Sequence, residues 1–172
     1  MDTPELPTTQ RPFNTPLESG LRCLFLLEAM APATCDLQRL VYLDYLLVHS
    51  ADVPDGPASL HARMPHRGGQ WLVRRQLVSE GLALMSSREL LDQRFTPFGI
   101  HYAATELTHP FLQYLNSAYA QNMREVAAWI VRAFQTMADA ELQGFMTTHL
   151  GRWGAEFDVG EVGPVSYTHL RA

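Results

Sequence analysis

The stretch QWLVRRQLVSEGLALMSSRELLDQRFTPFGIHYAATE, residues 70–106, decides how the chain folds. Its first half, Gln70 to Arg88, is predicted to be a helix, because apolar residues recur there at helical spacing. The members of that apolar face are Val73, Leu77, Gly81, Leu84 and Met85. The opposite face is polar and basic and carries Arg75, Gln76, Ser79 and Glu80.

The second half of the stretch predicts a β-hairpin. Residues 89–95 and 100–106 have the composition of two short strands, and Tyr102 and Ala104 alternate with their neighbours as in a half-buried strand. The link at residues 96–99 contains Pro97 and Gly99, which are strong turn residues. A helix with a basic, polar face followed at once by a two-stranded ribbon is typical of a winged helix-turn-helix. We therefore predict a mainly α-helical winged helix-turn-helix with a two-stranded wing.

Two helices are predicted before this stretch. The first runs from Pro16 to about Ala31, with Thr15 as its N-cap and Glu18 completing a capping box. Its apolar residues nearly encircle it, so it should be central. Asp36 is expected to cap a second helix that covers residues 37–49. In that helix Asp44 is expected to face away from the apolar surface, as a solvated or hydrogen-bonded surface group.

A helical C-terminal extension is predicted after the hairpin. It begins with a short piece around residues 111–115, continues as the longest helix over residues 117–137, and ends with a helix that Asp139 caps and Gly151 and Gly154 interrupt. The expected organisation is a flexible leader at residues 1–14, a winged-helix domain at 15–107, the extension at 108–157 packed on or beside it, and a tail at 158–172.

The end of the tail differs in character from the rest. Residues 164–172, and VSYTHLRA in particular, resemble the conceptual translation of a transposase-based sequencing adapter. We therefore expect the natural sequence to depart from the printed one near Gly163, and His169 is left out of functional reasoning.

Composition limits the function classes. The 172 residues carry a formal net charge of −5, so any affinity for phosphate must come from a local patch. The two cysteines, Cys23 and Cys35, form neither a CxxC pair nor a disulfide framework, which favours a reducing, cytoplasmic compartment. Cys23 is expected to be a packed core thiol. No stretch has the length of a membrane span or the pattern of a signal peptide.

Enzyme motifs are missing from the sequence. It contains no GxSxG, GxxxxGK[ST], HExxH or GxGxxG pattern, so we predict no catalytic residue, no cofactor and no small-molecule substrate. His61 and His66 lack a nearby carboxylate or thiolate that would complete a metal site. His49, Ser50 and Asp52 are the residue types of a hydrolase triad, but neighbours at a helix end do not give its geometry.

One segment is strongly one-signed. Residues 56–79 contain no Asp or Glu. Part of this segment belongs to the connection over residues 50–69, which is long for a compact winged helix. The candidate contact residues in this basic segment are His61, Arg63, His66, Arg67, Gln70, Arg74 and Arg75. They can contact DNA phosphates, bind an acidic protein partner, pair with acidic residues of this chain, or form a solvated surface. Because Arg74 and Arg75 are adjacent, they point about 100° apart on a helix and cannot both face one ligand.

Several segments resemble a known family. These are TPLESGLR at 15–22, LQRLVYLDYLLVHS at 37–50 and GIHYAATE at 99–106, with weaker matches at 59–67 and 80–85. Over about residues 14–157 the chain is similar to the middle component, second class, of bacterial ABC-three component systems. The resemblance implies a small, non-catalytic, winged-helix-like protein encoded beside an SMC/Rad50-like ABC ATPase and a third component. It also implies a role in conflict with phages or other mobile elements.

The resemblance supplies no catalytic residues to transfer. It leads to the expectation of an accessory subunit that docks on the ATPase and helps it to grip or sense duplex DNA. The alternative is a free-standing winged-helix transcriptional regulator, which would read two half-sites as a dimer.

Overall fold

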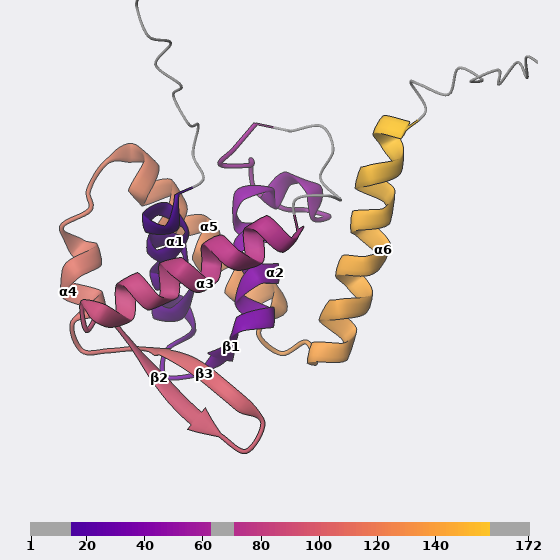
Figure 1. Cartoon of the computed structure of the whole chain (residues 1–172). Helices are drawn as coiled ribbons and strands as arrows, with labels where there is room; N and C mark the ends of the chain where they lie inside the picture. Colours follow the sequence, from indigo (N-terminus) through magenta and orange to yellow (C-terminus); the bar gives the residue numbers. More distant parts are fainter. Residues whose placement is uncertain (1–14, 63–70, 159–172) are drawn as a thin grey trace, which may run out of the picture.

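The computed structural model describes residues 15–62 and 71–158, with side chains described as far as His149. Within these ranges the protein is mainly helical and has one small antiparallel sheet (Figure 1). The elements are α1 (Pro16–Met30), β1 (Cys35–Asp36), α2 (Leu37–Val48), the 3-10 helix η1 (Ser50–Asp52), α3 (Trp71–Ser87), β2 (Leu91–Thr96), β3 (Gly99–Ala104), α4 (Thr108–Gln113), α5 (Ala118–Phe134) and α6 (Asp139–Asp158).

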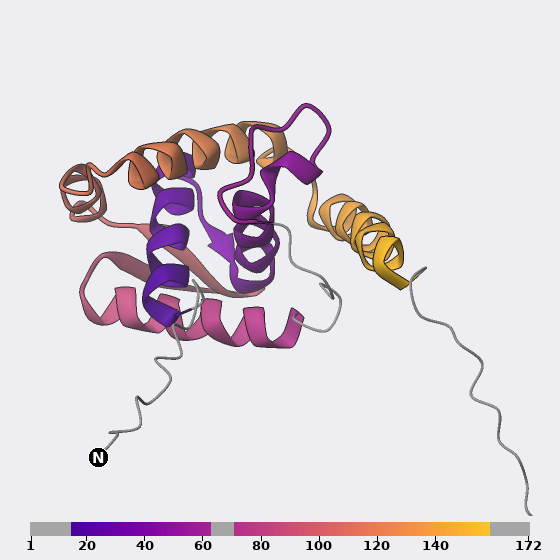
Figure 2. The ribbon, with the colours of Figure 1, turned by 90° about the horizontal axis from the view of Figure 1, so that it is seen from above.

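Helix α1 is central, as its nearly encircling apolar residues predict. Figure 2 shows α1 and α2 lying between α3 on one side and α5 on the other. The start of α1 is fixed by the expected capping box, in which Thr15 and Glu18 exchange backbone and side-chain hydrogen bonds. Asp36 caps α2 by accepting from the backbone N–H of Arg39 at 2.7 Å, also as expected. Cys23 is fully buried in the core.

The sheet has three strands in the order β1-β3-β2, all antiparallel. The hairpin is confirmed, and its strands begin and end within two residues of the expected positions. The sequence prediction missed β1, which pairs with the edge of β3 opposite β2 and places Cys35 across from Tyr102. A strand of two residues has no alternation to detect, and it forms because the chain between α1 and α2 passes along β3.

The buried face of α3 differs from the expected one. Val73 is 58% exposed, whereas Val78 and Leu82 are fully buried and Met85 is nearly so. The inner face therefore follows positions 74, 78, 81, 82 and 85, which places Arg74 rather than Val73 toward the protein interior. The apolar pattern alone misplaced this face by one position at the start of the helix.

The exit from α3 is a Schellman turn with a non-glycine residue at its left-handed position. The N–H of Leu90 donates to Met85 O, and the N–H of Glu89 donates to Ser86 O. Glu89 adopts a φ of 60° there, a conformation that glycine adopts more easily. The turn redirects the chain from α3 into β2 and so fixes where the hairpin leaves the body.

Helices α1 and α3 cross at a pair of glycines. A Cβ atom added to Gly20 would lie 2.7 Å from Gly81 O, and one added to Gly81 would lie 2.5 Å from Gly20 N and 2.6 Å from Pro16 O. The backbones of the two helices are therefore in direct contact. This close approach brings the start of α3 within reach of α1 and α2.

Substituting Gly81→Ala is expected to lower the free energy of unfolding by about 3 kcal/mol, because the added methyl group meets backbone atoms that cannot rotate away. Gly144→Ala in α6 is the matched control. Nothing lies within 4 Å of its added Cβ, so the better helix propensity of Ala should leave stability unchanged or raise it by about 1 kcal/mol. Urea unfolding followed by circular dichroism measures both changes, and equal stability for Gly81→Ala and wild type would contradict the prediction.

The C-terminal helices pack back onto the first part of the chain. Helix α5 contacts α1 and α2, and α6 contacts α2. Arg39 of α2 joins these parts, because its guanidinium donates to Asp139 Oδ1 at 2.6 Å and to Phe134 O and Met137 O at 2.6 and 2.9 Å. Helix α6 continues through Gly151 and Gly154 to Asp158, so the expected break at these glycines was wrong. The boundary drawn at residue 107 stays a prediction.

No helix within residues 15–62 and 71–158 combines the length and the apolar character that a membrane-spanning helix requires.

Candidate functional site

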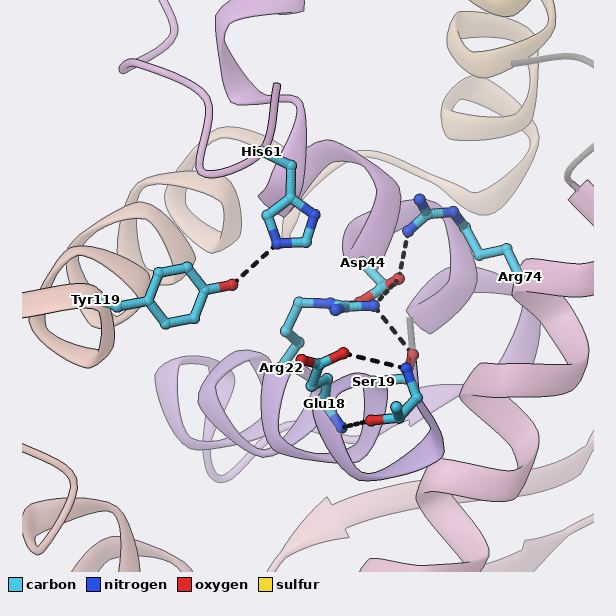
Figure 3. Close-up of polar contacts among 8 residues, drawn as sticks. Glu18, Ser19, Arg22, Asp44, His61, Arg74 and Tyr119 are labelled. Carbon is cyan, nitrogen blue, oxygen red and sulfur yellow. Dashed lines mark hydrogen bonds and ion pairs between the residues drawn. The ribbon is translucent and has the colours of Figure 1, made fainter. Parts of the chain in front are cut away.

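A buried ion-pair cluster lies where α1, α2 and α3 meet (Figure 3). Asp44 of α2 has no exposed surface. Its Oδ1 accepts from Arg22 Nε at 2.5 Å, and its Oδ2 accepts from Arg22 Nη2 at 3.2 Å and from Arg74 Nη1 at 2.5 Å. Arg22 also donates to Ser19 Oγ at 3.0 Å. The expectation that Asp44 is a surface group was wrong, because Arg22 and Arg74 supply the charges that allow the carboxylate to be buried.

The electrostatics of the cluster are set by two cations around one anion. Burial by itself would raise the pKa of Asp44, but the charges and hydrogen bonds of Arg22 and Arg74 outweigh it, so this pKa is lowered. Asp44 therefore stays ionised at neutral pH and neutralises one of the two guanidinium charges.

Aromatic residues of α2 hold the start of α3 against the same site. The guanidinium of Arg74 lies over the ring of Tyr45, with Cζ 5.3 Å from the ring centre. Trp71 stacks on Tyr42 with ring centres 5.2 Å apart, so Trp71 packs against the core. The side chain of Arg74 is 13% exposed. The first turns of α3 are thus positioned by contacts that face inward.

Arg75, the second arginine of the pair, also has a partner in this chain. Its Nη1 donates to Gln38 Oε1 at 2.5 Å, so it bends toward the start of α2. Both arginines that the structure describes in the basic segment are therefore held by α2. The reading in which an arginine pairs with an acidic residue of this chain is the one that the geometry of Arg74 supports.

His61 lies beside the cluster. Its Nε2 is 3.0 Å from the hydroxyl of Tyr119 at the start of α5 (Figure 3). Burial lowers the pKa of His61, and the nearby charges of Arg22 and Arg74 lower it further. His61 is therefore neutral near pH 7 and adds no positive charge to this surface. The other four candidates, Arg63, His66, Arg67 and Gln70, lie outside the described residues.

The outward side of α3 carries exposed apolar side chains, and its charged residues are one cation, Arg75, and one anion, Glu80. Leu72 is 79% exposed and Val73 is 58% exposed, and Gln76, Ser79 and Glu80 continue the exposed side toward β2. A shallow groove of about 430 Å³ runs along it, lined by Leu37, Leu72, Arg75, Gln76, Ser79 and Glu80. We call the surface formed by Leu72, Val73, Gln76, Ser79 and Glu80 the α3 face.

A second apolar surface lies at the end of the hairpin, which projects from the helices in Figure 1. Phe95 is 81% exposed, Phe98 is 94% exposed and Ile100 is 41% exposed. We call these three residues the hairpin tip. Phe95 and Ile100 are direct partners in the β2–β3 register, so their side chains lie side by side on one face.

Sequence reasoning missed Arg22 and the two apolar surfaces. A signal for Arg22 existed, because it is the one cation in a helix whose apolar residues nearly encircle it, and a buried cation requires a buried anion. The exposure of Leu72, Val73 and Phe95 had no such signal. Their apolar character predicts burial, and only the placement of the neighbouring elements shows that no described part of the chain covers them.

Within residues 15–62 and 71–158, no group of three or more His, Cys, Asp or Glu residues could hold a metal ion. Cys23 and Cys35 are free and buried, and burial is the main cause of the raised pKa of both thiols. Both cysteines are therefore unreactive packing residues. The contacts of Arg74 with Asp44 and Tyr45 position α3.

Comparison with known proteins places this arrangement in a family. The family model for Middle Component 2 of the ABC-three component (ABC-3C) systems matches residues 12–156. No curated protein and no solved structure matches the chain. The matched range contains the buried cluster, the α3 face and the hairpin tip.

Proposed function

Since the chain belongs to the Middle Component 2 family of ABC-three component systems, we propose that it is a non-catalytic accessory subunit. In this proposal it docks on the ATP-hydrolysing component of its system, an SMC/Rad50-like ABC ATPase. ATP hydrolysis then belongs to that ATPase and not to this chain. A third component completes the system, which acts against phages or other mobile elements in the cytoplasm.

The fold in this proposal is a winged helix with a helical C-terminal extension. Support comes from the order of elements, in which α1, β1, α2, α3, β2 and β3 follow one another and the sheet has the order β1-β3-β2. In a helix-turn-helix the second helix of the motif is the one presented to the ligand, and α3 has that place here. Fold alone does not assign a ligand, so the surface of α3 must be considered.

The observation that carries the proposal is the character of the α3 face. A helix that contacts DNA directs cations toward phosphates, because neutralising phosphates supplies most of its affinity. Here Arg74 is paired with the buried Asp44 and Arg75 is bonded to Gln38, while Leu72 and Val73 are exposed. Large exposed apolar side chains are typical of protein interfaces. The partner of this surface is therefore proposed to be a protein.

A contact with duplex DNA is assigned in this proposal to Arg63 and Arg67 of the basic segment. Arg74 is left out of that role because its guanidinium is bound to the buried Asp44. For the same reason, a variant that removes Arg74 would disturb folding as well as binding and cannot separate the two effects. An Arg63→Ala, Arg67→Ala double variant tests the DNA contact while Arg22, Asp44 and Arg74 keep their identities.

Co-purification with the ATPase component tests the proposal. The full chain is co-expressed with the ATPase encoded beside it and purified by affinity, with nuclease treatment to remove DNA. We expect a stable complex without DNA, and for the Arg63→Ala, Arg67→Ala variant an intact complex whose affinity for duplex depends less steeply on salt. Failure to co-purify, together with tight sequence-specific duplex binding by this chain alone, would overturn the proposal in favour of a transcriptional regulator.

A further inference from the structure

Within residues 15–62 and 71–158, no strand pairs with the outer edge of β2. The strand order β1-β3-β2 leaves one side of β2 without a neighbouring strand, and Asp92 and Arg94 on this strand are 58% and 52% exposed. An unpaired edge presents backbone N–H and C=O groups that can pair with another strand. We infer that this edge pairs antiparallel with β2 of a second copy of the chain, about a two-fold axis at Gln93.

The charges on β2 are arranged for pairing with a copy of itself. In an antiparallel pair centred on Gln93, Asp92 of one copy lies opposite Arg94 of the other, and Arg94 opposite Asp92. Directly opposed charges of unlike sign stabilise a strand pair, whereas like charges oppose it. Within one chain Arg94 Nε and Asp92 Oδ2 are 3.6 Å apart, a weak exposed contact that leaves both groups able to take a new partner.

The same two-fold axis accounts for an exposed aromatic residue. Side chains alternate along a strand, so Leu91, Gln93 and Phe95 share one face of β2. The body of the protein covers Leu91, which is 2% exposed, but does not reach Phe95, which is 81% exposed. In the paired arrangement Phe95 lies beside Leu91 of the second copy. The body that covers this second Leu91 is then adjacent to Phe95 and can cover it.

The pairing closes after two copies. A two-fold interface uses the same edge of both chains, so the dimer has no remaining β2 edge to continue the sheet. The inference therefore specifies a dimer and excludes an open fibre. It also leaves the α3 face uncommitted, so it does not depend on docking to the ATPase.

Disulfide trapping of the full chain tests the register directly. Residues that face each other across an antiparallel pair have Cα atoms about 4.5–5.5 Å apart, which is within reach of a disulfide. Gln93→Cys should form an intermolecular disulfide under mild oxidation, since the native Cys23 and Cys35 are buried and do not compete. Ser79→Cys, on an exposed position of α3, is the control and should stay monomeric on a non-reducing gel.

Sedimentation of the purified chain provides the second measurement. We expect twice the monomer mass for the wild type, dissociation for Asp92→Arg and for Arg94→Asp, and recovery of the dimer when both substitutions are combined. A monomer at concentrations up to about 100 µM, with no more trapping for Gln93→Cys than for Ser79→Cys, would overturn the inference. A mass that grows without limit with concentration would also overturn it, because the proposed pairing closes at two copies.

Discussion

Replacing Asp44 with Asn is expected to lower the free energy of unfolding by about 3–5 kcal/mol, which approaches the whole stability of a marginally stable domain. The substitution keeps the size of the side chain and removes its charge. Arg22 then remains 2% exposed without a counter-ion, and Arg74 loses the bond that holds the start of α3. Urea unfolding followed by circular dichroism measures the change.

Asp139→Asn is the matched control for this substitution. Asp139 accepts from Arg39 at 2.6 Å, a distance close to those in the buried cluster, but its side chain is 73% exposed. Exposed pairs are worth about 0–1 kcal/mol, so the control separates burial from geometry. A loss of less than about 1 kcal/mol for Asp44→Asn would contradict this account of the cluster.

A triple variant tests whether the cost comes from unpaired charge. Arg22→Met, Asp44→Leu and Arg74→Met together replace the ion pairs with apolar groups of similar size. Because no buried charge is then left without a partner, the triple variant is expected to be more stable than Asp44→Asn. If the triple variant is instead less stable than Asp44→Asn, the polar contacts themselves control stability, and not the cost of leaving a buried charge unpaired.

The lowered pKa of Asp44 also predicts how stability depends on pH. A carboxyl whose pKa is lower in the folded state contributes stability above its unfolded value of about 3.9. This contribution is lost as the pH falls through the folded value. The difference in stability between wild type and Asp44→Asn should therefore be constant at neutral pH and shrink below about pH 4. A difference that stays constant into that acidic range would contradict the assignment.

Introducing two charges into the α3 face is expected to weaken binding of the ATPase component by about 30-fold or more. Leu72→Glu with Val73→Glu places carboxylates where the proposal requires apolar contact, and central apolar contacts of an interface contribute about 2 kcal/mol or more. Both side chains are more than half exposed, so the variant should fold like the wild type. Equilibrium binding to the purified ATPase measures the loss.

Ala83→Glu is the control for the charged variant. Ala83 is exposed on the same helix, about 16 Å along the axis from Leu72, and Glu is a good helix former. It adds negative charge to α3 one turn beyond the residues that define the α3 face. Equal loss of binding for Ala83→Glu would indicate a general electrostatic effect, and unchanged binding for the double variant would remove the α3 face from the interface.

Local rules account for what the sequence predicted correctly. The capping box at Thr15 and the Asp36 cap are decided by residues three positions apart, and both are confirmed. The turn at residues 96–99 was found because Pro97 fixes its own φ and Gly99 tolerates the positive φ of 122° that it adopts here. The hairpin and the bounds of α1 and α2 follow from such short-range signals.

The parts that could not be predicted depend on contacts between distant residues. Arg22 and Asp44 are 22 positions apart, and nothing near Asp44 in the sequence shows that two arginines will surround it. The two-residue strand β1 exists only because β3 passes beside it. Composition identifies Arg74 as a cation, but it does not show that Arg74 pairs with Asp44, which lies 30 positions before it in the sequence.

Isothermal titration of the full chain into the purified ATPase component, without DNA, tests the central claim most directly. We predict saturable binding that is strongly reduced for Leu72→Glu with Val73→Glu and unchanged for Ala83→Glu. The absence of binding by the folded wild-type chain would contradict the claim that this protein docks on the ATPase through a protein interface.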